Sequence, residues 1–202
     1  MTRFLLAAVL ALAANGAAAA TYKIDPRHTQ VHFTYGHNQY SHLSARLNEV
    51  NGTLEFDPAN PGASSISLEL PLSSLSTGVP GLDTHMRSAD FFDAEKFPTA
   101  SFKSTKVTVR DATHFDLAGD LTIKGVTKPA VFAVTVNHAG ENARRKTPMA
   151  GFDAVATIKR SEFGVDNMLA VTGDEIQVRV TMEASVPKDE PAEAAPAPAG
   201  KS

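Results

Sequence analysis

Cysteine and tryptophan are both absent from this chain of 202 residues, and each absence excludes a class of protein. Without cysteine the chain has no disulfide, thiolate zinc site, iron–sulfur cluster or thiol nucleophile. Without tryptophan, and with only three tyrosines, it lacks the aromatic girdles of an outer-membrane barrel. The net charge of −3 excludes a basic footprint for nucleic acid. No serine lies in a G-x-S-x-G pattern, the sign of a serine hydrolase of that class.

The N-terminus has the three-part pattern of a secretory signal peptide. A positive charge at Arg3 precedes a short apolar run, and small residues in an A-x-A arrangement end at Ala20. The apolar run is too short to span a bilayer, although a retained membrane anchor is the alternative. We therefore expect residues 1–20 to be cleaved after about Ala20, which leaves a periplasmic mature chain that begins at Thr21.

The C-terminus differs in composition from the rest of the chain. Residues 187–202 are rich in proline and alanine and carry too few apolar side chains to form a core. We expect a disordered tail there, with a spacer towards the cell wall or a partner as the alternative. Residues 21–186 are long enough to bury a core without disulfides, so they are expected to form one domain.

Alternation of apolar and polar residues dominates residues 21–186. The run SISLELPL places Ile66, Leu68 and Leu70 on one face, and EIQVRVTMEASV alternates in the same way. The whole pattern predicts about eight strands, with turns at Lys124–Gly125 and at residues 137–140. Because no long amphipathic helix is available to cover a sheet, the strands must form either two packed sheets or a closed barrel, and their length favours the barrel.

Four segments carry a family resemblance: YKIDPRHTQVHFTYGH, LDTHMRSADFFDAEKFPTASFKS, GDLTIKGVTKP and IKRSEFGVDN. Their order and spacing resemble the YceI-like family of periplasmic polyisoprenoid-binding proteins from residue 21 to about residue 186. The resemblance implies an all-β, extended, lipocalin-like eight-stranded antiparallel barrel with a short helical insertion near residues 83–93. It also implies an elongated apolar cavity for a long-chain amphiphile. The family usually has Gly and Phe where this chain has Ala45 and Leu47, so we expect a different cavity shape there.

One segment, residues 82–98, concentrates acidic and basic side chains beside three phenylalanines. On a helical turn, Arg87 could reach both Asp83 and Asp90, which predicts a cluster of ion pairs that holds the helix on the barrel. One alternative is that His85 or Arg87 meets the phosphate or carboxylate head group of a ligand. The other alternative is an acid–base catalytic pair.

Four histidines, His28, His32, His37 and His42, are spaced four to five residues apart, which suggests a metal site. On one strand, however, His28 and His32 would lie about 13 Å apart, too far to share an ion easily. His32 is also expected to face away from the apolar interior. We therefore expect no metal site, and we place His37 at the rim of the cavity.

We expect a periplasmic carrier or storage protein, not an enzyme, that holds a polyprenyl, quinone or fatty-acyl lipid and needs no other cofactor. A lipid- or quinone-related enzyme or accessory factor, and an envelope scaffold, are the alternatives. The basic residues 144–146 could contact an anionic membrane surface, and either a monomer or a dimer fits the sequence. The residues expected to bind the ligand are Phe33, Tyr35, His37, Phe56, Leu68, Leu70, His85, Arg87, Phe91, Phe92, Phe102, Leu121, Phe132 and Phe152.

Overall fold

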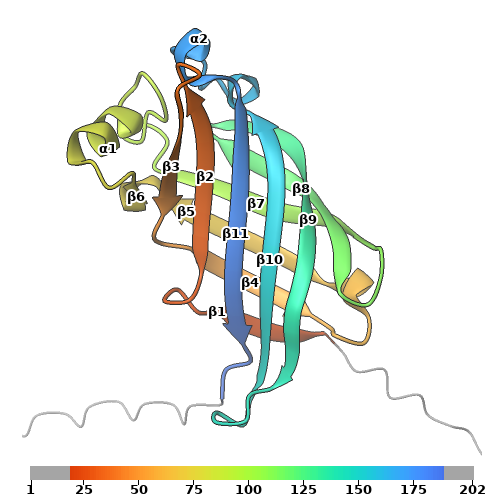
Figure 1. The fold of residues 1–202 in the computed structure, drawn as a ribbon. Coiled ribbons are helices and arrows are strands. Elements are labelled where there is room, and N and C mark those ends of the chain that lie inside the picture. Colours follow the sequence, from red (N-terminus) through yellow and green to blue (C-terminus); the bar gives the residue numbers. More distant parts are fainter. Residues whose placement is uncertain (1–18, 189–202) are drawn as a thin grey trace, which may run out of the picture.

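An antiparallel sheet closes on itself to form the body of the molecule (Figure 1). The computed structural model describes residues 19–188. Eight strands form the ring in the order β1-β4-β5-β7-β8-β9-β10-β11, and β11 pairs with β1 to close it. Their bounds are β1 Ala20–Ile24, β4 Asn51–Phe56, β5 Ser65–Pro71, β7 Thr99–Val109, β8 His114–Ile123, β9 Val126–Glu141, β10 Pro148–Lys159 and β11 Glu175–Ser185. The predicted eight-stranded barrel is confirmed.

Three more strands widen the sheet at one end of the barrel: β2 (Gln30–His37), β3 (Ser41–Leu47) and β6 (Leu75–Ser76). Both β1 and β2 pair with β11, at successive parts of its length, because residues 25–29 interrupt what is otherwise one strand path. The sheet ends at β6. The chain between β6 and β7 then carries the helical insertion beside this free edge (Figure 1).

The predicted helical insertion is present, but its helix has other bounds. Helix α1 spans Pro80–Arg87, so it begins three residues before Asp83, and residues 88–97 form turns. Proline favours the first helical position because its fixed φ suits the helix and its missing N–H would have no partner there. Asp83 consequently lies in the first turn, where a negative charge interacts well with the helix dipole.

The remaining helical segments are short. They are η1 (Pro61–Ala63), η2 (Leu72–Ser74), η3 (Arg160–Phe163) and α2 (Leu169–Thr172). Helix α2 lies at the same end of the barrel as the hairpin between β2 and β3 (Figure 1). Within residues 19–188, no helix combines the length and the apolar content needed to cross a bilayer.

One predicted turn is confirmed and the other is wrong. The turn between β8 and β9 consists of Lys124 and Gly125, whose φ angles of 50° and 75° fit a two-residue hairpin. No turn occurs at residues 137–140, because β9 continues to Glu141 and the chain reverses in the following loop. A bulge in the pairing of β9 with β10 absorbs one residue, so that this polar, glycine-containing stretch stays within the sheet.

The inward faces of the strands meet in the barrel, with aromatic side chains at the centre. Phe56 and Phe152 pack edge to face with ring centroids 5.1 Å apart, and Phe102 and Phe132 do the same at 5.2 Å. Such pairs add to the apolar burial that stabilises the fold. The ring of Phe102 lies directly over Gly119, where a Cβ atom would come within 2.4 Å of it. The alternating apolar stripes of the sequence are therefore the interior of the barrel.

Candidate functional site

The interior of the barrel is not filled completely by side chains. A cavity of about 350 Å³ remains, lined by every strand except β1 and by the helical segments at the end with α1 and α2. Its surface is almost wholly apolar. A volume of this order lies within the range of small-molecule sites in proteins. Because apolar walls offer water few hydrogen bonds, the space suits an apolar ligand.

Thirteen of the fourteen residues predicted to bind the ligand line this cavity. They are Phe33, Tyr35, His37, Phe56, Leu68, Leu70, His85, Phe91, Phe92, Phe102, Leu121, Phe132 and Phe152. Neighbouring strands bring them together in rows, because Leu68 pairs with Phe102 and Phe102 with Leu121 across β5, β7 and β8. The fold therefore places these side chains on the wall of the cavity. Their contact with a ligand stays a prediction.

Arg87 does not line the cavity, and the predicted ion pairs with Asp83 and Asp90 are wrong. The Nη1 of Arg87 donates a hydrogen bond of 3.0 Å to the carbonyl oxygen of Leu75, which ties the end of α1 to β6. Asp83 accepts two bonds of 2.6 Å, from the hydroxyl and the backbone N–H of Thr77. These two bonds hold the pKa of Asp83 below its ordinary value. Because α1 begins at Pro80, Asp83 meets the incoming chain instead of Arg87.

His85 and the phenylalanines after it cover one side of the cavity. The ring of His85 stands edge to face with Phe91 at 5.0 Å, and Phe92 packs against Phe33 of β2 at 6.1 Å. The Nε2 of His85 lies 3.8 Å from Asp90 Oδ2, and both side chains are largely exposed. An exposed pair at this distance is weak, so it leaves His85 free to turn towards the cavity or the solvent.

Arg160 was missed by the sequence reasoning, although it lines the cavity and is buried. Its guanidinium donates hydrogen bonds of 2.7, 2.7 and 2.8 Å to the carbonyl oxygens of Gly173, Val165 and Asn167. A fourth bond, of 2.7 Å, reaches the hydroxyl of Thr172. These bonds hold the chain between β10 and β11 across the end of the barrel. Burial lowers the pKa of Arg160.

A signal for Arg160 was present in the sequence. Along β10, the side chains of Phe152, Ala154 and Ile158 face the cavity, and position 160 continues this even-numbered series. A charged residue in register with an inward stripe predicts a buried, fully hydrogen-bonded group. The bonding partners could not be predicted, because all four lie in the loop that follows.

Lys124 joins two segments at the end of the barrel that the Arg160 bonds close. Its Nζ donates to the carbonyl oxygen of Ala89, at 3.3 Å, and to that of Gly164, at 3.1 Å. The adjacent Gly125 lies against the ring of Phe97, where a Cβ atom would come within 2.5 Å. The hairpin between β8 and β9 therefore fixes both the insertion and the chain that precedes α2.

The cavity meets the solvent at this end. Among its lining residues only Ser65, His85 and Met168 are exposed. His85 belongs to α1, and Met168 directly precedes α2. The cavity therefore opens at the end of the barrel that carries α1 and α2, where two of the three exposed lining residues lie, and the third, Ser65, begins β5.

His28 and His32 take part in local contacts outside the cavity. His32 faces outward and bonds to Gln30 at 3.0 Å, and His28 bonds to Asp25 at 2.9 Å. Within residues 19–188, no three His, Asp or Glu side chains come close enough together to hold a metal ion.

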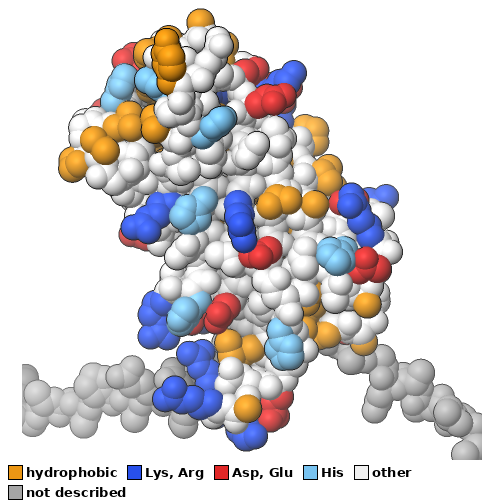
Figure 2. Space-filling view, in the orientation of Figure 1, with side chains coloured by type: hydrophobic (Ala, Val, Ile, Leu, Met, Phe, Trp, Pro, Cys, Tyr) orange, Lys and Arg blue, Asp and Glu red, His pale blue; other side chains and the backbone are white. Residues whose placement is uncertain are grey.

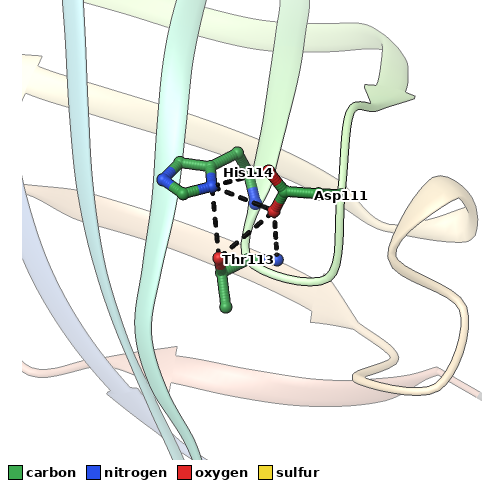
Figure 3. A network of polar contacts seen from close by, with 3 residues as sticks. All are labelled: Asp111, Thr113 and His114. Atoms are coloured by element: carbon green, nitrogen blue, oxygen red, sulfur yellow. Dashed lines mark hydrogen bonds and ion pairs between the residues drawn. The ribbon is translucent and has the colours of Figure 1, made fainter.

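A polar network fixes the turn between β7 and β8 (Figure 3). Asp111 accepts hydrogen bonds from the backbone N–H groups of Thr113 and His114, at 2.8 and 2.9 Å, and its carboxylate also contacts the His114 ring at 2.9 Å. The bond from the Thr113 backbone is the main reason that the pKa of Asp111 falls to about 2. None of the three residues lines the cavity, so the network stabilises a hairpin.

Comparison with known proteins agrees with this architecture. The family model described as the YceI-like domain matches residues 22–184. Protein YceI of Escherichia coli O157:H7 is 35% identical over 181 residues, which cover 87% of this chain and 92% of that protein. The crystal structure of Burkholderia cenocepacia BcnA has the same fold, with a TM-score of 0.72, 24% identity and coverage of 79% of this chain and 98% of that one. A polyisoprenoid binding domain from Saccharophagus degradans, implicated in plant cell wall breakdown, gives a TM-score of 0.63 at 15% identity, over 84% and 99% of the two chains.

Proposed function

Because this chain belongs to the YceI-like family, we propose that it binds a long-chain isoprenoid or a similar amphiphile in the barrel cavity and carries or stores it. The almost wholly apolar surface of the cavity is the observation that supports this function most directly. Each buried methylene contributes about 0.8 kcal/mol, so a long hydrocarbon tail can bind tightly without polar contacts. The name of the Saccharophagus degradans domain supports an isoprenoid as the ligand class.

The tail and the head group of the ligand are expected at different places. Phe33, Phe102 and Leu121 are among the side chains that would surround the tail, with the other cavity-lining residues named above. A polar head group would find few partners inside, so it should stay near the opening, where His37 and His85 are available. A polyprenyl, quinone or fatty-acyl lipid would satisfy both requirements.

We propose a binding role without catalysis. Arg87 and Asp83 of the charged segment make structural hydrogen bonds, and the remaining pair, His85 and Asp90, is loosely held and exposed. Hydrolysis of polyprenyl esters or pyrophosphates by the purified protein at enzymatic rates would contradict this role.

The periplasm is the proposed location, with residues 1–20 as a cleaved signal peptide. Residues 1–18 lie outside the described part of the chain, and Ala20 is the first residue of β1, where it pairs with Phe56. Cleavage after Ala20 would therefore remove one residue of that strand.

The proposed disordered tail, residues 187–202, also lies mostly outside the described range. Whether the protein is a monomer or a dimer can be measured by sedimentation.

Substitution of Leu121 by tryptophan tests the proposed function. Leu121 is buried with 6% of its surface exposed, and it lines the cavity. In a filled core the larger side chain would destabilise the fold by about 1–3 kcal/mol, whereas a cavity has space for it. We expect the delipidated Leu121→Trp protein to melt close to wild type and to lose most of its affinity for a fluorescent polyprenyl probe.

The matched control is Val131→Trp, because Val131 lies on neighbouring β9 and is 57% exposed. It should leave both melting and probe affinity unchanged. A wild-type protein that binds no probe, together with a destabilised Leu121→Trp variant, would contradict the proposal. Mass spectrometry of lipid extracted from protein purified out of its own envelope would then identify the natural ligand.

A further inference from the structure

Exposed apolar side chains gather at the end of the barrel where the cavity opens. Among residues 19–188, six large hydrophobic residues are exposed, and three of them lie on the segments that surround the opening. Tyr40, at the tip of the hairpin between β2 and β3, is 93% exposed, Val79, directly before α1, is 55% exposed, and Met168, directly before α2, is 44% exposed. We call these three residues the rim.

Two of the rim segments, the β2–β3 hairpin and α2, are bonded to each other. The N–H of Asn38, in the hairpin, donates a hydrogen bond of 2.6 Å to the carbonyl oxygen of Val171 in α2. The insertion that follows Val79 also contacts β2, since Phe92 packs against Phe33. Hydrophobic side chains are correspondingly visible over this end in Figure 2.

The apolar surface of the rim continues into the cavity. Met168 belongs to both, because it lines the cavity and is exposed to solvent. Single exposed hydrophobic residues are common on protein surfaces and need no explanation. Here, however, three segments each expose one beside the opening of the cavity, and a group of this kind indicates an interaction surface. A lipid tail could pass along this surface without crossing water.

The rim segments themselves carry more acidic than basic residues, although the Lys124 amine reaches the carbonyl oxygens of Ala89 and Gly164 within them. The segments that form the rim, residues 37–42, 77–90 and 164–174, contain no lysine and only one arginine, Arg87. They contain the acidic residues Asp83, Asp90, Asp166 and Asp174. The basic loop at residues 144–146 joins β9 to β10 at the opposite end of the barrel (Figure 1).

We propose that the rim inserts into the interfacial region of a lipid bilayer, so that the cavity opens directly to membrane lipid. This inference rests on the proposed function, because it supplies the route by which a lipid would enter and leave. Tyrosine is suited to this depth, since its ring is apolar and its hydroxyl can stay in the headgroup region. Docking is driven by apolar contact, and the basic loop takes no part in it.

Flotation with phosphatidylcholine vesicles tests the proposal. The variant is Tyr40→Ser/Val79→Ser, since neither residue lines the cavity. Serine at position 79 also suits the N-cap of α1, so the fold should be retained. We expect vesicle partitioning to fall more than about tenfold, because two apolar side chains no longer leave water. Transfer of a fluorescent polyprenyl probe between vesicles should slow by a similar factor.

Two controls separate this surface from the alternatives. The double variant Val131→Ser/Val155→Ser, at two exposed valines on the barrel wall, should float and transfer like wild type. The variant Arg144→Glu/Arg145→Glu/Lys146→Glu, in the basic loop, should do the same, and added salt should not change flotation. Affinity for the probe in solution should stay at the wild-type value in all three.

Several outcomes would overturn the proposal. They are a rim variant that floats like wild type, a wild type that does not float, and flotation that requires anionic lipid and is lost in the basic-loop variant. If the wild type floats but binds no probe in solution, the proposed lipid-carrying function fails while the docking surface stands. Circular dichroism verifies the fold, and Tyr40→Ser alone repeats the test at the most exposed rim position.

Discussion

Replacing Arg160 with methionine would test how the end of the cavity is held closed. Methionine keeps an unbranched apolar stem of similar length, so the cavity wall stays filled. The change removes the four hydrogen bonds of 2.7–2.8 Å that join the guanidinium to the loop before β11. The result therefore measures these bonds, with little effect from lost packing.

The expected loss follows from the burial of the four acceptors. The carbonyl oxygen of Val165 is bonded in a buried setting, and leaving it unpaired costs about 2 kcal/mol. The other three acceptors are partly buried and regain some water, so each costs about 1 kcal/mol. Removing a buried charge relieves its desolvation and offsets about 2 kcal/mol. We expect a net loss of about 3 kcal/mol in the free energy of unfolding.

Urea denaturation followed by circular dichroism measures this loss. With a slope of about 2 kcal/mol per molar urea, the midpoint should fall by about 1.5 M. The matched control is Arg179→Met, because Arg179 is exposed and its closest carboxylate, Asp153, lies 3.6 Å away. That control should change stability by less than about 0.5 kcal/mol. Equal midpoints for the two variants would refute the argument that Arg160 holds the loop.

Two further predictions concern residues that the sequence placed differently or did not assign. Arg87→Ala should destabilise the protein by about 1–2 kcal/mol in urea denaturation, because one hydrogen bond from a charged donor to the Leu75 carbonyl is lost. A loss above about 4 kcal/mol would instead indicate buried ion pairs. For Asp111, the pKa of about 2 in the folded protein lies below its ordinary value of 3.8, so the stabilising effect of its carboxylate is present above about pH 4 and lost as the pH falls to 2. The melting temperatures of wild type and Asp111→Asn should therefore differ at pH 5 and converge near pH 2, and a difference independent of pH would contradict this assignment.

The charged segment shows why side-chain partners were harder to predict than strands. The spacing of Asp83 and Arg87 on a helix allows a contact, but where the helix begins decides whether it forms. Proline at position 80 set that beginning three residues earlier, and Thr77 became the partner of Asp83. The extension of β9 through residues 137–140 has a similar origin, because pairing with β10 outweighed the local turn preference.

Alternation along the chain was enough to assign Phe102, Leu121 and Phe132 to one shared interior. Successive side chains of a strand point to opposite faces whatever the partner strand is, so this assignment needs no tertiary information. The same pattern predicted about eight strands in all, whereas the sheet within residues 19–188 has eleven, because β1, β3 and β6 were not identified. Whether the interior would be full or hollow did not follow, because that depends on how closely side chains from strands far apart in the chain approach one another. The bonds of Arg160 and the position of the rim likewise depend on loops that meet only when the barrel has closed.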